Sequence, residues 1–281
     1  MNSNRRSRFP CRRTFRGSSR HSRPSRHSRY SLVAVASAAA LGVALTGCGS
    51  QDAAPRAERK STGAKVLWVG DSIAGAEGPA IGAALKANGV EFKDMSSDGG
   101  GTVVAGSEKI TKMIAADTWK QLAKNVASFK PTVIAYQITT YDWGSRNQQR
   151  AAYEKLVKTA EAAGAKAVFV PAPPVKIDDF YKKYASQMRS APQVAQEVAK
   201  GSGAAAVFLD SSRLWGTDAS AEQAQRASDG IHNCQQGAAA FASWFAVQLG
   251  RQEGFTPVAV DTWAKGSWTG DGRYANLKCD S

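Results

Sequence analysis

Apolar runs of strand length alternate with longer stretches of helical periodicity in the chain after residue 64. Brief apolar runs bounded by turn residues are typical of buried strands in a parallel sheet, whereas apolar positions three or four apart indicate a helix. This alternation predicts an α/β fold in which a five-stranded parallel sheet has helices on both faces. The predicted strands are residues 65–69, 90–95, 132–138, 166–170 and 204–209. The predicted helices are residues 75–88, 109–129, 146–163, 180–188, 192–200, 219–226 and 235–249.

Positive charge is concentrated at the start of the chain. Residues 1–29 hold ten arginines and no acid, so they account for ten of the net +14 and leave a modest +4 for the other residues. Such an arm is compatible with nucleic-acid binding. The uncharged run over residues 31–45 indicates another role, because a basic region before an apolar run too short to span a membrane is typical of a secretory signal. We therefore expect an exported protein with no nucleic-acid partner.

The end of this apolar run, Leu45-Thr46-Gly47-Cys48, resembles the lipobox of bacterial lipoproteins. The resemblance implies that Cys48 begins the mature protein and carries lipid, including palmitate, which anchors it to the outer face of the bacterial cell membrane. An uncleaved membrane anchor is the alternative, and it gives the same outward location. Arg12-Arg13-Thr14-Phe15 resembles a twin-arginine export signal, so the choice between this route and the Sec route stays open. The expected parts are a signal peptide (1–47), a flexible polar tether (48–64) and one domain (65–281).

Two cysteines remain in the expected domain. In an oxidising, exported setting we expect Cys234 and Cys279 to form a disulfide, although two unrelated thiols remain the alternative. The bridge would close a loop of about 45 residues, worth roughly 4 kcal/mol in the chain-entropy model. There is no Cys-x-x-Cys pair, and His232 is the only histidine after the leader. We therefore expect no metal and no organic cofactor.

Candidate chemistry begins at Gly70-Asp71-Ser72, which joins the first predicted strand to the first predicted helix. Such a turn holds the Ser72 hydroxyl beside free backbone N–H groups, as a nucleophile requires, although the same residues also make a good helix cap. The triple-glycine loop over residues 96–102, the loop over 139–144 and the turn over 228–234 should share one rim with Ser72. Ligands of such sheets bind at the carboxyl ends of the strands.

The Ser72 turn and the later block Asp229-Gly230-Ile231-His232 together resemble the GDSL/SGNH hydrolase family, over about residues 65–249. The resemblance implies a three-layer, flavodoxin-like fold and a serine hydrolase acting on ester bonds. Ser72 would attack the ester carbonyl, His232 would accept the hydroxyl proton, and Asp229 would orient and stabilise the imidazole. These residues are our candidate catalytic residues.

The family's remaining blocks contribute to the oxyanion hole together with the Ser72 N–H. We expect Gly100 to supply the glycine N–H, from its Gly-x-Thr pattern. The family's third block is Gly-x-Asn-Asp, but here the chain has Thr139-Thr140-Tyr141-Asp142 and lacks the asparagine. Either the hydroxyl of Thr139 or Tyr141 replaces it, or Ser72 and Gly100 act alone.

We expect an extracytoplasmic esterase that hydrolyses an acyl ester of a carbohydrate or another cell-envelope substrate. An O-acyltransferase that uses the same acyl-serine intermediate is one alternative. A noncatalytic lipoprotein that binds a glycan or another ligand is a second, suggested by the altered third block. The aromatic residues of the tail either line a substrate cleft or cover an edge of the core: Phe255, Trp263, Trp268 and Tyr274.

Overall fold

A computed structural model describes residues 60–221 and 226–279 of this chain, all within one compact unit that runs from Pro55 to Ser281. The unit is built on a five-stranded parallel sheet in the order β2-β1-β3-β4-β5. This result confirms the predicted α/β fold. No helix in the described part of the chain is both long and apolar enough to cross a membrane. The strands are β1 (Lys65–Gly70), β2 (Glu91–Ser96), β3 (Val133–Ile138), β4 (Lys166–Pro171) and β5 (Ala206–Phe208).

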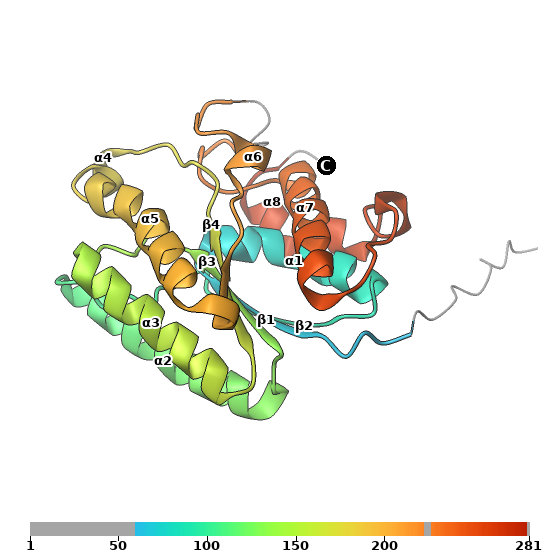
Figure 1. The fold of residues 1–281 in the computed structure, drawn as a ribbon. Coiled ribbons are helices and arrows are strands. Elements are labelled where there is room, and N and C mark those ends of the chain that lie inside the picture. The colour runs from blue at the N-terminus through green and yellow to red at the C-terminus, as the bar shows by residue number, and fades with distance from the viewer. Residues whose placement is uncertain (1–59, 222–225, 280–281) are drawn as a thin grey trace, which may run out of the picture. The chain divides into compact units, whose positions relative to one another are not determined.

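Helices cover both faces of the sheet (Figure 1). Successive side chains of a strand point to opposite faces. On β1, Val66 and Trp68 accordingly join the apolar cluster under α1 and α7, while Leu67 and Val69 join the cluster under α2, α3 and α5. The helices are α1 (Ser72–Ala87), α2 (Lys109–Phe129), α3 (Arg146–Ala162), α5 (Ala185–Gly201) and α7 (Gln235–Glu253).

The order of the strands places a crevice between β1 and β3. The chain passes from β1 to β2 on one side and then returns to β3 on the other side of β1, with Val66 paired to Val133. Helices that leave neighbouring strands on opposite faces open a crevice at their carboxyl ends, where ligands bind in folds of this order. Ser72 and the loop after Ile138 both lie at this point of the sheet.

Helix α1 is buried between the sheet and later parts of the chain. Asp71 caps its start by accepting a hydrogen bond from the Ile73 N–H at 3.0 Å, as expected for an aspartate at this position. Glu77 is fully buried; one carboxyl oxygen accepts from the Gln137 amide at 2.6 Å, and the other has no partner in the described part of the chain. Burial is the main cause that raises the pKa of Glu77 well above its ordinary value.

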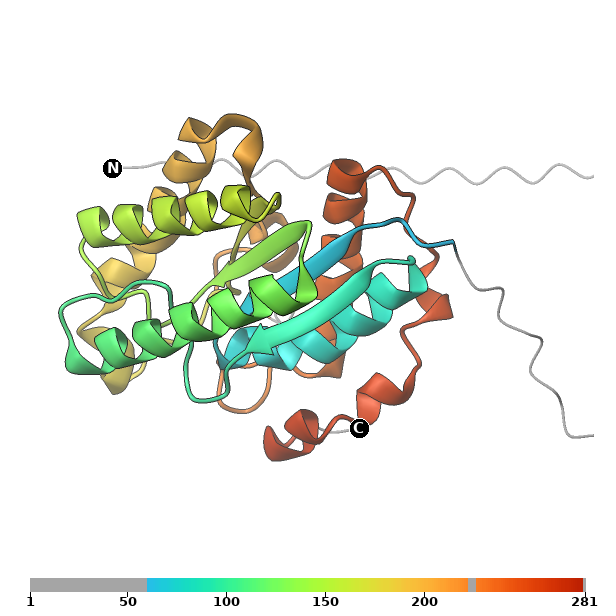
Figure 2. The ribbon, with the colours of Figure 1, turned by 90° about the horizontal axis from the view of Figure 1, so that it is seen from below.

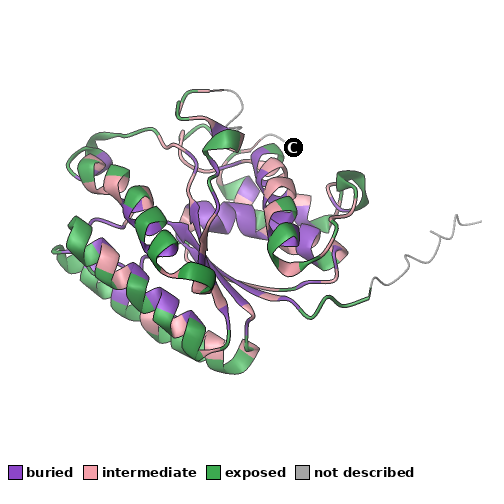
Figure 3. Ribbon diagram, viewed as in Figure 1, coloured by how far each residue is buried: buried purple, intermediate pink, exposed green. Residues whose placement is uncertain are grey.

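The C-terminal segment, residues 255–279, packs along α1 in short helical turns (Figure 2). Trp263, Trp268 and Tyr274 are buried in the same apolar cluster as α1 and α7. The interpretation that these aromatic residues cover the core is therefore confirmed for these three. Figure 3 shows the buried residues along α1, in contrast to the exposed outer sides of α2 and α3. The turns are η3 (Val260–Thr262), η4 (Ser267–Gly270) and α8 (Gly272–Asn276).

Four predicted elements differ in detail. The helices expected over 180–188 and 192–200 become α4 (Asp179–Lys182) and one long α5, which continues through Pro192. The helix expected over 219–226 is wrong where the chain is described, because residues 219–221 and Arg226 are not helical; a short α6 (Ser212–Trp215) comes before them instead. The fifth strand is shorter than expected, since residues 203–205 form a 3-10 turn, η1.

Candidate active site

Ser72 is the first residue of α1, directly beyond the buried strand β1. A residue at this position has a backbone N–H that no earlier turn of the helix can accept. The Ser72 N–H donates no hydrogen bond within residues 60–221 and 226–279. Ser72 itself is partly exposed.

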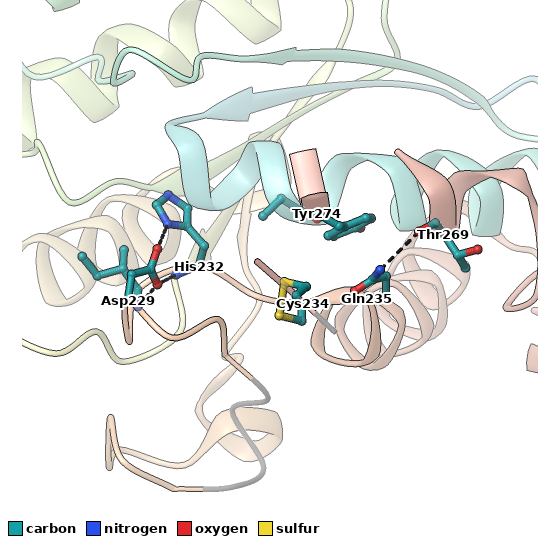
Figure 4. Close-up of a disulfide and its surroundings, with 9 residues drawn as sticks. Asp229, His232, Cys234, Gln235, Thr269 and Tyr274 are labelled. Carbon is teal, nitrogen blue, oxygen red and sulfur yellow. Dashed lines mark hydrogen bonds and ion pairs between the residues drawn. A yellow bond between two sulfur atoms is a disulfide. The ribbon is translucent and has the colours of Figure 1, made fainter. Parts of the chain in front are cut away.

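The structure brings Ser72, His232 and Asp229 together across a separation of 160 residues. The Ser72 hydroxyl lies 2.8 Å from His232 Nε2, and Asp229 Oδ2 lies 2.6 Å from His232 Nδ1. Asp229 also organises its own turn, because its Oδ1 accepts from the N–H groups of Ile231 at 2.8 Å and His232 at 3.0 Å. Gly230 has φ of +69°, a conformation that favours glycine and lets the turn fold back. Figure 4 shows the Asp229–His232 pair beside the start of α1.

These hydrogen bonds favour the ionised form of Asp229. Burial alone would raise the pKa of Asp229, but the hydrogen bonds from the His232 ring and the two N–H groups bring that pKa below its ordinary value. Asp229 is therefore a carboxylate, and it accepts the proton on Nδ1. Nε2 is then the acceptor for the Ser72 hydroxyl.

A disulfide joins this turn to the C-terminal segment (Figure 4). Cys234, two residues past His232, is bonded to Cys279, which confirms the predicted pair. Shortly before Cys279, Tyr274 donates to the Ala76 carbonyl at 2.9 Å and Arg273 donates to the Gly75 carbonyl at 2.8 Å.

The Arg273 side chain replaces a hydrogen bond that α1 lacks. The Gly75 carbonyl would normally accept from the N–H four residues on, but that residue is Pro79, which has none. The C-terminal segment thus contacts α1 and is joined by the disulfide to the turn that carries His232, hereafter the histidine turn.

The loop after β3 is fixed against the start of α1. Asp71 Oδ2 accepts from both the N–H of Thr140 at 2.9 Å and its hydroxyl at 2.8 Å. Asp71 is fully buried, and burial raises its pKa, while the bonds from Thr140 and Ile73 oppose the rise. The sequence pattern did not identify Thr140 as part of this arrangement, because nothing in its local pattern reveals a partner 69 residues away.

The glycine loop was expected to offer the N–H of Gly100 to an oxyanion, but in the structure that N–H is already hydrogen-bonded. The Gly100 N–H donates to the Ser97 carbonyl at 3.2 Å, and so closes a turn rather than facing outward. The Gly101 N–H donates no hydrogen bond among the residues that the structure describes. A Cβ on Gly101 would lie 2.2 Å from the Gly70 carbonyl oxygen, so this glycine lies directly against the Gly70–Ser72 turn. We therefore replace Gly100 with Gly101 as the candidate donor.

Thr139 and Tyr141 were the two hydroxyls expected to replace the missing asparagine, and the hydroxyl of Thr139 is already bonded to another residue. Its hydroxyl donates to Asp142 at 3.0 Å, and the side chain is buried. The expectation that Thr139 faces an oxyanion is therefore corrected.

Tyr141 remains. A Cβ on Gly100 would meet its Cζ at 3.3 Å, so the hydroxyl-bearing end of the ring faces the glycine loop. Burial, followed by the charge of Asp71, raises the pKa of Tyr141, so its proton is retained.

Tyr181 supports this arrangement from α4. The rings of Tyr181 and Tyr141 lie edge to face with their centroids 6.5 Å apart, and burial raises the pKa of Tyr181 to about 12. The pKa of Tyr141 is raised too, so both phenols keep their protons at neutral pH.

Two hollows lie at the rim of the sheet. One, of about 310 Å³, is mainly apolar and is lined by the loops after β3 and β4 and by α5, including Thr139, Thr140, Pro174 and Met188. The other, of about 400 Å³, lies between the glycine loop and α2 and has more polar groups, including Ser96, Asp117 and Gln121.

Among residues 60–221 and 226–279, no three His, Cys, Asp or Glu side chains are grouped as metal ligands. Cys48, the expected signal and residues 48–59 of the expected tether lie outside the described residues. The last part of that tether is described and packs on the domain, because the Thr62 N–H donates to the Gly89 carbonyl at 3.0 Å and Ala64 is buried.

Comparison with known proteins agrees with this fold. The family model described as "SGNH domain (fused to AT3 domains)" matches residues 43–228. No curated protein matches the chain at significant sequence similarity.

Solved structures share the fold at low sequence identity. A protein described as an acylhydrolase, from Bacteroides fragilis, has a TM-score of 0.53 at 13% identity, over 70% of this chain and 92% of its own. LAE5, an α/β hydrolase enzyme from the metagenome of Lake Arreo, Spain, has a TM-score of 0.50 at 16% identity, over 69% of this chain and 96% of its own. A GDSL-like lipase from Bacteroides thetaiotaomicron has a TM-score of 0.50 at 12% identity, over 66% of this chain and 88% of its own.

Proposed function

Because the chain belongs to the SGNH domain family, a family of ester-hydrolysing enzymes, we propose that it hydrolyses acyl esters through Ser72, His232 and Asp229. The observation that carries this proposal is the unbroken pair of contacts from Asp229 to the imidazole and from the imidazole to the Ser72 hydroxyl. A hydroxyl, a neutral base and a carboxylate in this order are the arrangement that activates a serine nucleophile.

The reaction proceeds in two steps. In the first, Ser72 Oγ bonds to the ester carbonyl carbon while its proton moves to His232 Nε2; the ester C–O bond then breaks and the alcohol leaves with that proton. In the second, water attacks the acyl-serine and gives a proton to Nε2, the acyl–Oγ bond breaks, and Ser72 regains the proton. Asp229 stays ionised and stabilises the imidazolium in both steps.

The oxyanion of each tetrahedral intermediate is held by the Ser72 N–H, the Tyr141 hydroxyl and the Gly101 N–H. Ser72 and Gly101 have N–H groups without a partner in the described chain, and Tyr141 presents its hydroxyl end to the same loop. Neutral donors fixed in place before the reaction stabilise the charge that develops there. Tyr141 thus stands where the family has asparagine.

Solvent access to the site supports hydrolysis over transfer to a second alcohol. The side chain of Asp229 is 37% exposed and that of His232 is 18% exposed. Water can therefore reach the acyl-serine, whereas an acyltransferase has to exclude water from this step.

The two hollows suggest how a substrate lies. The apolar hollow shares Thr139 and Thr140 with the loop that contacts Asp71, and it suits the acyl group. The hollow at the glycine loop offers hydroxyl, amide and carboxyl groups that suit a hydroxyl-rich alcohol such as a carbohydrate.

A panel of p-nitrophenyl esters with acyl chains of increasing length tests the activity. We expect hydrolysis by the folded domain, and a fall in kcat of about 10⁴-fold or more in Ser72→Ala and in His232→Ala. A wild-type protein that binds the esters without turnover would instead identify a noncatalytic binding protein.

We also propose that the mature chain is held at the outer face of the bacterial cell membrane by lipid on Cys48. The lipobox at Leu45–Cys48 supports this location. Palmitate supplied to expressing bacteria should label the wild type and leave Cys48→Ser unlabelled; equal labelling of the two would contradict the anchor.

A further inference from the structure

Asp142 is a fully buried carboxylate at the end of the loop after β3. Its Oδ1 accepts from the hydroxyls of Thr102 at 2.5 Å, Tyr136 at 2.7 Å and Thr139 at 3.0 Å, and its Oδ2 accepts from Tyr153 at 2.6 Å. We propose that Asp142 is a positioning residue for ester hydrolysis, because this cluster of four hydroxyls holds the two loops of the oxyanion hole in register.

The cluster has the hydrogen-bonding pattern of an ionised carboxylate. Each hydroxyl has one proton to donate, and a carboxylate with two oxygens has about four lone-pair positions to receive them. Burial raises the pKa of Asp142, and the four hydroxyl bonds, with Thr102 first, oppose that rise. The negative charge in turn adds to the effect of burial in raising the pKa of Tyr136 and of Tyr153 well above their ordinary values.

The four hydroxyls come from elements that differ in their role. Tyr136 lies on β3 and Tyr153 on α3, so these two tie the carboxylate to the buried core. Thr102 directly follows Gly101 in the glycine loop, and Thr139 belongs to the same loop as Tyr141. Asp142, which is bound to the core, therefore holds both of these loops in place.

Two of these hydroxyls also accept hydrogen bonds from the backbones of the two loops. The Thr139 oxygen that donates to Asp142 also accepts from the Tyr141 N–H at 3.2 Å. On the other loop, the Val103 N–H donates to the Tyr136 hydroxyl at 3.3 Å. Oxyanion donors act only when they are held within a fraction of an ångström of the charge, so loosening either loop would weaken transition-state binding.

The inference rests on the proposed esterase activity and concerns kcat rather than substrate binding. Removing the Thr102 hydroxyl in Thr102→Val should lower kcat by about 10-fold or more while KM changes by less than about 2-fold. Thr102→Ser restores a hydroxyl and should return kcat to within about 3-fold of the wild type.

A matched control separates positioning from loss of stability. Thr111 is also a fully buried threonine whose hydroxyl donates to a backbone carbonyl, at 2.6 Å, but it lies at the start of α2. Thr111→Val should leave kcat within about 2-fold of the wild type. If Thr102→Val does not accumulate as folded protein, Thr139→Val removes a second hydroxyl from Oδ1 and gives the same test.

The outcomes are distinct. Unchanged kcat in folded Thr102→Val, or an equal loss of kcat in Thr111→Val, overturns the positioning role while the esterase proposal stands. A wild-type protein without esterase activity overturns the proposed function, and this inference with it.

Discussion

Breaking the Cys234–Cys279 disulfide should cost this protein both stability and reactivity. The two cysteines are 45 residues apart, and the loop-closure entropy that their bond removes from the unfolded chain corresponds to about 4 kcal/mol. Either the double variant Cys234→Ser/Cys279→Ser or reduction of the wild type makes this change.

The loss of reactivity follows from where the bond lies. Cys234 is two residues past His232, and Cys279 follows the residues that clamp α1, Arg273 and Tyr274. Without the bond, the histidine turn is no longer covalently joined to the segment that contacts α1, the helix that begins at Ser72. Small displacements of reacting groups are costly, so we expect the rate at which a fluorophosphonate labels Ser72 to fall by about 10-fold.

Urea unfolding of the wild type, with and without reductant, measures the first effect, and labelling kinetics measure the second. The double serine variant with reductant is the control, because reductant should change nothing further there. Wild-type protein with two alkylatable thiols, a free energy of unfolding within about 0.5 kcal/mol of the oxidised form and the same labelling rate would refute the reasoning.

Three further changes test the site. Gly101→Ala places a methyl group against the Gly70 carbonyl, so it should slow fluorophosphonate labelling and lower the free energy of unfolding by about 1–3 kcal/mol. Gly99→Ala is the control and should do neither, because its Cβ would meet only one atom, at 4.0 Å. Equal effects in the two variants would contradict the close approach of Gly101 to Gly70. Tyr141→Phe removes the hydroxyl donor, and steady-state kinetics should show kcat lowered by about 100-fold with little change in KM; an unchanged kcat excludes this hydroxyl from the oxyanion hole. The folded-state pKa of Glu77 is raised, so its contribution to stability is present below the pKa of an unfolded glutamate and is lost as pH rises through the folded pKa. Thermal unfolding should therefore show Glu77→Gln gaining more over the wild type at about pH 9 than at about pH 5, and a gain that is the same at both would argue against a buried, proton-binding carboxyl.

The strands and the place of the Gly70–Ser72 turn could be predicted because their signals are local. β1 and β3 are buried apolar runs, and the Gly70–Ser72 turn follows one of them directly. The histidine turn carries its own short-range signal, since Asp229 and His232 are three residues apart and interact within one turn.

Other features depend on partners far along the chain. Asp142 resembles an ordinary turn residue in sequence, and only the folded sheet brings the hydroxyls of Thr102 and Tyr153 to it. The choice between Gly100 and Gly101 depends on which N–H the loop has already used, which a run of glycines cannot show. Helix α5 continues through Pro192 because its apolar face is buried against the sheet and α3, an effect that local propensity does not include.

The proposed esterase activity requires Ser72 to be a nucleophile that His232 activates. Intact mass measurement after treatment with a fluorophosphonate tests it most directly, with peptide mapping to locate the adduct. We expect a single adduct on Ser72, none in Ser72→Ala, and strongly slowed labelling in His232→Ala. Folded wild-type protein without an adduct, or with an adduct that persists in Ser72→Ala, would contradict it.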